Sequence, residues 1–196
     1  MGKCLARRLD AGRMRRSRET AKRSDLVGFA GHGYCASHSR YFWGLWLHLV
    51  TTPSGLPITF ALTIPKTDER EVLRDLLEVE PELLGTRPGQ VIVADKGYAS
   101  GEFETFVVDH GATLLRPTMK RERRRPGAEL LRPLRQIIES VNDTLKGQLD
   151  LEQHGGRNAS GVVTRVLQRL LALTAAIWHN EGTGNRPLRS LLAYDH

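Results

Sequence analysis

The chain of 196 residues carries 29 Lys and Arg against 22 Asp and Glu, a formal net charge of +7, and 40% of its residues are hydrophobic. This composition suits one domain with a hydrophobic core and excludes a collagen, a coiled coil and a fully disordered chain. Two cysteines are too few for a disulfide framework, and the longest apolar stretch, Leu170 to Trp178, is shorter than the ~20 residues that span a bilayer. We therefore expect a cytoplasmic protein without a membrane segment.

The hydrophobic pattern predicts an α/β fold, a mixed sheet flanked by helices. Residues 1–40 keep no period and are interpreted as a basic, largely irregular segment, 41–180 as the main domain, and 181–196 as a loose tail. The predicted elements are a strand hairpin (41–50 and 56–64), a helix (69–79), a strand (91–94), a helix (101–110), a strand (112–115) and two helices (133–149 and 160–179).

Two acidic residues occupy positions that suit a catalytic or metal-binding carboxylate. Asp95 follows the wholly apolar strand 91–94, where a carboxylate either projects into a crevice or caps the next turn. Glu139 lies on the polar face of the helix 133–149, which also carries Arg135, Asn142 and Lys146. This face is either a solvent-facing surface with ion pairs or a site where a carboxylate binds a hard cation and Arg and Lys bind a phosphodiester.

Positive charge is concentrated between Arg116 and Arg125, where Glu122 is the only acid. Such a run is typical either of a solvated loop or of a surface that attracts polyanions, with the release of counterions from each phosphate contacted.

These residues carry a resemblance to a known family. Asp95–Tyr98 at a strand end resembles the second-Asp segment of DDE transposases of bacterial insertion sequences. Arg135, Glu139 and Lys146 have the spacing R-x3-E-x6-K, which resembles the C-terminal signature of the IS4-like DDE group, although Arg132 stands where a Tyr is common. Three longer segments resemble the IS982 family: 17–25, 33–39 and 139–147.

The resemblance implies a ribonuclease-H-like fold and metal-dependent DNA strand cleavage and strand transfer at element ends. Asp95, Glu139 and a first Asp would hold two Mg²⁺ ions, replaceable by Mn²⁺, about 3.5–4 Å apart. The expected partners of the chain are the DNA ends of the element, target DNA and further copies of the chain in a transpososome. The resemblance also implies a location near the nucleoid and no small-molecule cofactor. The residues assigned to DNA are Arg135, Lys146, Asn142, Lys96, Lys120, Arg121, Arg123, Arg124 and Arg125.

The first Asp departs from the family pattern. Asp10 is the only acid in the right region, yet Arg7 and Arg8 precede it and suit a central buried strand badly, so the first strand is doubtful. This departure favours an N-terminally truncated or frame-disrupted copy. Two alternatives stay open: a catalytically inactive remnant that binds DNA or intact transposase, and a basic RNA-binding module with a solvent-facing aromatic sheet surface.

Overall fold

The computed structural model describes residues 3–10, 25–35, 39–85, 89–186 and 188–194, with the backbone alone at 3–10, 35, 40 and 193. The chain forms two compact units. The first comprises Met1–Arg8, His48–Ala61 and Asp68–Glu139, and the second comprises Leu9–Leu47, Leu62–Thr67 and Ser140–His196.

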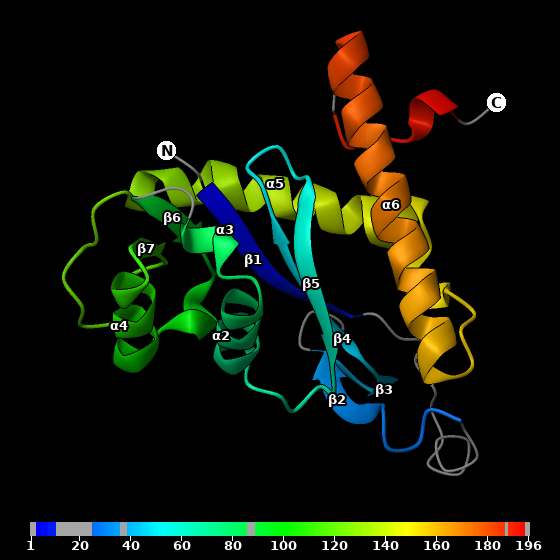
Figure 1. The fold of residues 1–196 in the computed structure, drawn as a ribbon, viewed down its shortest axis with the longest axis horizontal. Helices are drawn as coiled ribbons and strands as arrows, with labels where there is room; N and C mark the ends of the chain where they lie inside the picture. Colours follow the sequence, from blue (N-terminus) through cyan, green and yellow to red (C-terminus); the bar gives the residue numbers. More distant parts are fainter. Residues whose placement is uncertain (1–2, 11–24, 36–38, 86–88, 187, 195–196) are drawn as a thin grey trace. The chain divides into compact units, whose positions relative to one another are not determined.

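Five strands form a sheet in the order β5-β4-β1-β6-β7 (Figure 1). Their bounds are β1 Lys3–Asp10, β4 Trp46–Thr51, β5 Pro57–Thr63, β6 Gln90–Val93 and β7 Ala112–Leu115. β6 runs parallel to both of its neighbours, β1 and β7. The sheet and its helices agree with the predicted α/β class.

The N-terminal strand that looked doubtful from sequence is present, in the middle of this sheet. β1 pairs with β6 from Lys3 opposite Val91 to Leu5 opposite Val93, so this pairing ends before Arg7 and Arg8. The two arginines therefore do not prevent the strand from pairing. Residues 1–40 also contain β2 (Gly31–Cys35), so the expectation of a largely irregular segment is wrong for β1 and β2.

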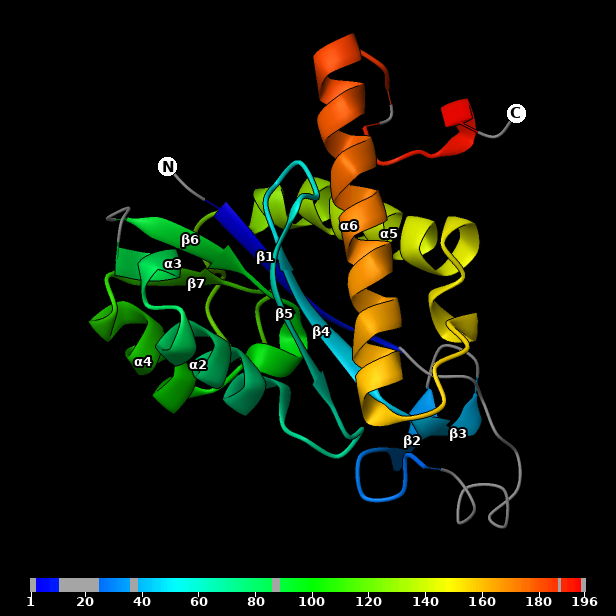
Figure 2. The ribbon, with the colours of Figure 1, turned by 45° about the vertical axis from the view of Figure 1, so that its right-hand side comes forward.

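In the first unit, helices cover both faces of β6 and β7 (Figures 1 and 2). Side chains that alternate along a strand point to opposite faces, and here Ile92 and Val93 belong to different buried clusters. The Ile92 cluster is packed by α2 (Glu69–Val79), the short α3 (Glu82–Gly85) and α4 (Gly101–Asp109). The Val93 cluster is packed by α5 (Leu131–Asp143).

Local sequence explains where these helices begin. Asp68 caps α2 by accepting a hydrogen bond from the Arg70 N–H, and Ser100 caps α4 by accepting one from the Phe103 N–H. The predicted bounds of α2, 69–79, are confirmed.

The second unit contains an antiparallel hairpin of β2 and β3 (Arg40–Gly44). The predicted single strand 41–50 is therefore wrong, because it is divided between β3 and β4, which belong to different sheets. Tyr41 is exposed, but the aromatic residues that follow it are buried: Phe42, Trp43 and Trp46. The prediction that these aromatic residues pack in the core is confirmed for the buried three, whereas Tyr34 and Tyr41, paired on β2 and β3 with ring centroids 5.0 Å apart, are both exposed.

Residues 188–194 are held by hydrogen bonds within the second unit, which corrects the prediction of a loose tail. The buried side chain of Asn180, in α6 (Ala159–Thr183), donates hydrogen bonds to the carbonyls of Leu188 and Ser190 and accepts one from the Tyr194 hydroxyl. This amide satisfies two backbone acceptors at once and therefore holds residues 188–194 in place.

By length and composition alone, α6 is long and apolar enough to cross a membrane, with a mean hydropathy of 1.3 over its best window. No membrane segment was expected from the sequence, because the apolar residues of this helix are interrupted by Gly, Ser and Thr. A mostly buried core helix of a soluble protein passes the same test, whereas 33% of this window is buried here. The buried face of α6 carries these apolar residues: Val162, Val166, Leu170, Leu173, Ala176 and Ile177.

Candidate functional site

Asp95 lies just beyond the carboxyl end of β6 and is exposed. Its Oδ1 accepts a hydrogen bond from the Gly97 N–H at 2.8 Å and caps the 3₁₀ turn Lys96–Tyr98. Asp95 can therefore cap the turn and also serve as a free-standing carboxylate, since the cap uses Oδ1 and Oδ2 takes no part in it. Lys96, in the same turn, is also exposed.

A second carboxylate, that of Glu69, lies against the Asp95 turn. A Cβ built on Gly97 would stand 1.8 Å from Glu69 Oε1 and 3.1 Å from Asp95 Oδ1. The two carboxylate oxygens are therefore close neighbours above Gly97. From the sequence, Glu69 is interpreted only as part of an acidic helix start without a catalytic role. It is 28 positions away from Gly97, and no local pattern connects such residues.

This close approach predicts the effect of Gly97→Ala. The added methyl group would overlap Glu69 Oε1, so we expect the Glu69 side chain to rotate away and the free energy of unfolding to fall by about 1 kcal/mol, the low end for overpacking. Thermal melts measure it. Gly101→Ala is the matched control, because no atom lies within 4 Å of its added Cβ. Equal melting temperatures for the two variants would contradict the prediction.

Glu139 lies in α5 and is paired with Arg135 one turn earlier. The Arg135 Nε donates to Glu139 Oε1 at 2.9 Å, and 46% of the Glu139 side chain remains accessible. The predicted i,i+4 neighbours are confirmed. This ion pair contributes little stability, because both groups are exposed, but it restricts the direction of the carboxylate.

Asp95 and Glu139 flank one buried cluster of the first unit. Val93, two residues before Asp95, and Ile138, next to Glu139, pack in the same apolar cluster between β6, β7 and α5. The strand and the helix that carry the two carboxylates therefore share a buried core.

Lys146 and Asn142 belong to the second unit. Lys146 Nζ forms an ion pair with Glu152 Oε1 at 2.9 Å, beside an open pocket of about 420 Å³ that is lined by Asp143, Lys146, Gly147, Asp150, Glu152 and Gln153. Asn142 is partly buried in the last turn of α5. The predicted helix 133–149 is α-helical only as far as Asp143, and residues Thr144–Gln148 form a π-helical turn. Lys146 therefore does not follow Glu139 by two regular α-helical turns, as a continuous helix would require.

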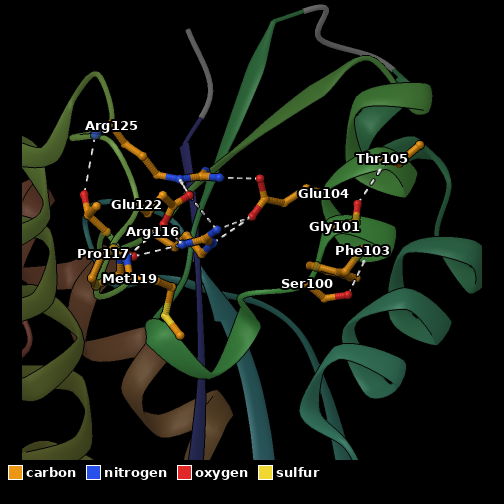
Figure 3. Close-up of polar contacts among 11 residues, drawn as sticks. Ser100, Gly101, Phe103, Glu104, Thr105, Arg116, Pro117, Met119, Glu122 and Arg125 are labelled. Carbon is orange, nitrogen blue, oxygen red and sulfur yellow. Dashed lines mark hydrogen bonds and ion pairs between the residues drawn. The ribbon is translucent and has the colours of Figure 1, made fainter.

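The basic run Arg116–Arg125 is ordered and divided into two groups. Arg116 and Arg125 are partly or fully buried and paired with Glu104 and Glu122 (Figure 3). The other four cations are exposed: Lys120, Arg121, Arg123 and Arg124. The assignment of Arg125 to DNA stays a prediction, but its charge is already neutralised within the protein.

The contribution of Glu122 to the stability of the fold depends on pH. The bidentate hydrogen bonds from Arg116 are the main cause that lowers the pKa of Glu122 from 4.5 to about 2, with help from the Met119 N–H and Arg125. A carboxyl with a lowered folded-state pKa stabilises the fold above its unfolded pKa, and this contribution is lost as the pH falls towards the folded value.

We therefore expect wild type to have a higher melting temperature than Glu122→Gln at pH 6. This difference should disappear as the pH falls from about 4.5 to about 2. Calorimetry of both proteins across this range measures it. Glu104 faces the same arginines and is retained in both proteins. A difference that stays constant down to pH 2 would contradict the prediction.

The carboxylates suit Mg²⁺ by donor type, because this ion prefers hard oxygen ligands and keeps several waters. Among the described side chains, however, no three from His, Cys, Asp and Glu lie close enough to hold a metal ion. Asp10 is the last residue of β1, and its side chain lies outside the described part. The pairing of β1 with β6 ends at Leu5–Val93, five residues before Asp10.

Comparison with known proteins adds one match. A family model described as "Transposase DDE domain" matches residues 9–175, most of the chain, including Asp10, Asp95 and Glu139. No curated protein matches the chain.

Proposed function

We propose, since the chain belongs to the transposase DDE-domain family, that it cuts DNA at the ends of an insertion sequence and joins the cut strand to a target, using a divalent metal ion. The family membership makes it a transposase by class, with DNA as its partner. The finer assignment, an IS982-type element acting in the cytoplasm through several copies of the chain, rests on the sequence resemblance.

The observation that carries the proposal is the common packing of the elements that bear Asp95 and Glu139. Val93 and Ile138 share one buried cluster, so the strand end and the helix face are anchored to the same core. The strand order β5-β4-β1-β6-β7, with β1 central and parallel to β6, supports a ribonuclease-H-like arrangement. In such a sheet, working groups gather at the carboxyl ends of parallel strands.

The roles follow from the chemistry of each group. Asp95 and Glu139 would hold Mg²⁺, which when bound lowers the pKa of an attacking hydroxyl and stabilises charge on a phosphodiester. Asp95 is pre-oriented by the Gly97 N–H and Glu139 by Arg135. Lys96 and the exposed cations of the basic run would bind the DNA backbone, as would Lys146 and Asn142 once Lys146 exchanges Glu152 for phosphate.

A nicking assay tests the proposal. The chain is incubated with a duplex of the terminal repeats that flank its gene, with Mg²⁺, with Mn²⁺ or with EDTA. We expect strand-specific nicks at the repeat end with either metal and none with EDTA. Binding without nicks under all three conditions would overturn the assignment of cleavage.

One observation favours a second candidate, a family member that binds DNA without cutting it. The first Asp of the family pattern has one counterpart in this region, Asp10, which lies five residues beyond Leu5, where the pairing of β1 with β6 ends. Such a protein would occupy element ends and compete with an active transposase. Protection of the repeats from nuclease digestion, together with an absence of nicks, distinguishes it from the first candidate.

A further inference from the structure

Four residues of the first unit form an ion-pair cluster, here called the clasp: Glu104, Arg116, Glu122 and Arg125 (Figure 3). Arg116 Nη1 and Nη2 donate to the two oxygens of Glu122 at 2.9 and 3.0 Å, and its Nε donates to Glu104 Oε1 at 2.7 Å. Arg125 bridges the same acids, with its Nε 2.8 Å from Glu122 Oε1 and its Nη2 on Glu104 Oε2.

The clasp closes the two ends of the basic run onto α4. Arg116 directly follows β7 and is only 6% exposed, whereas Glu104 comes from the middle of α4. The Met119 N–H donates to Glu122 Oε2 at 2.8 Å, which also ties the loop backbone to the cluster. Bidentate Arg–carboxylate pairs are directional as well as strong, so they determine the shape of the loop.

A dense run of cations would otherwise spread apart through mutual repulsion. With Arg116 and Arg125 neutralised, the remaining four cations project from a closed loop: Lys120, Arg121, Arg123 and Arg124. Arg121 adopts a positive φ of 79°, which marks a tight turn at the middle of the run.

The loop also starts at the edge of the sheet that carries Asp95. The Ala94 N–H donates to the Leu115 carbonyl at 3.0 Å, so the residues just before Asp95 and just before Arg116 are hydrogen-bonded neighbours. A DNA backbone held by this loop would therefore pass close to the Asp95 carboxylate.

We propose that Glu104 and Glu122 are positioning residues, which hold the loop in the shape that binds the DNA phosphate backbone beside Asp95. The nature of the ligand rests on the proposed function, but the clasp itself does not. Arg116 and Arg125 are structural in this scheme, and the four exposed cations bind the phosphates. A preformed loop loses less conformational entropy on binding than a flexible one.

Glu122→Gln separates positioning from simple electrostatics, because the two predict opposite effects. The variant gains one unit of positive charge, so charge alone predicts tighter binding to a 30-base-pair duplex in EDTA. Loss of loop shape predicts weaker binding, by about tenfold at 0.1 M salt, and a salt slope that corresponds to about one or two fewer neutralised phosphates. Glu104→Gln, which changes the clasp from α4, should act in the same direction.

Glu129→Gln is the matched control. Glu129 is exposed in the 3₁₀ turn Ala128–Leu130 just after the loop, so its replacement makes the same change in charge outside the clasp. We expect this control to bind DNA as tightly as wild type or slightly more tightly. If Glu122→Gln binds as tightly as Glu129→Gln, the positioning role is overturned.

Limited trypsin digestion tests the clasp without DNA. The four exposed cations are trypsin sites, and a closed loop resists cleavage. We expect cleavage within 120–124 to be about tenfold faster in Glu122→Gln and Glu104→Gln than in wild type and Glu129→Gln, since proteolysis follows the population of open loop. Unchanged cleavage would overturn the clasp, whereas faster cleavage in a protein that never binds DNA would overturn the proposed function alone.

Discussion

Replacing Asp95 with Asn, or Glu139 with Gln, is expected to lower metal-dependent nicking of terminal-repeat DNA by about three orders of magnitude. A metal ion contributes several kcal/mol of transition-state stabilisation, and each 1.36 kcal/mol corresponds to about a tenfold change in rate. Removal of one negatively charged ligand forfeits most of this contribution. The measurement is the single-turnover nicking rate with Mg²⁺ and again with Mn²⁺.

Both substitutions preserve the local structure. An amide oxygen at position 95 can still accept from the Gly97 N–H, and one at position 139 can still accept from Arg135. Melting temperatures should therefore stay close to that of wild type. Asp109→Asn, at an exposed residue at the end of α4, is the control and should nick at the wild-type rate. A rate within threefold of wild type for either site variant would show that the assignment of that residue is incorrect.

Replacing Lys120, Arg121, Arg123 and Arg124 together with Gln is expected to flatten the salt dependence of DNA binding. Each phosphate that the protein no longer neutralises reduces the slope of log K against log salt by about 0.9. Four such phosphates reduce it by roughly three to four and weaken binding at 0.1 M salt by roughly two to three orders of magnitude. The clasp arginines are retained, so the loop keeps its shape. Titrations of a duplex at several salt concentrations measure the slope.

The chain offers a control with the same change in charge. Lys66, Arg157, Arg165 and Arg186 are exposed and, like the loop set, comprise one lysine and three arginines. Their joint replacement should change the slope much less than that of the loop set. Equal slopes for the two variants would mean that net charge, and not the loop, controls binding.

Elements with strong local signals were predicted well from sequence. An N-cap and helical spacing identified α2, and short apolar runs between turns identified β6 and β7. These signals need only residues within a few positions, which is why no tertiary information was required. The Arg135–Glu139 pair was predicted for the same reason, since helical geometry places i and i+4 side by side.

Elements that depend on partners in other parts of the chain were not predicted well from sequence. The run 41–50 has β character throughout, and only the separate partners of β3 and β4 divide it between two sheets. β1 was doubted because of Arg7 and Arg8, yet its pairing with β6 ends before them. The prediction of a loose tail was wrong because the hydrogen-bond partner of residues 188–194, the Asn180 side chain, lies outside the tail in α6.

By itself the amino-acid sequence determined the α/β class, the family resemblance and the two candidate carboxylates, because these depend on short-range pattern and spacing. Only the tertiary structure decided that Glu69 lies against the Asp95 turn and that two arginines of the basic run are neutralised by Glu104 and Glu122. Such interactions join residues from different elements. Their energies depend on distance and burial, which no sequence spacing specifies.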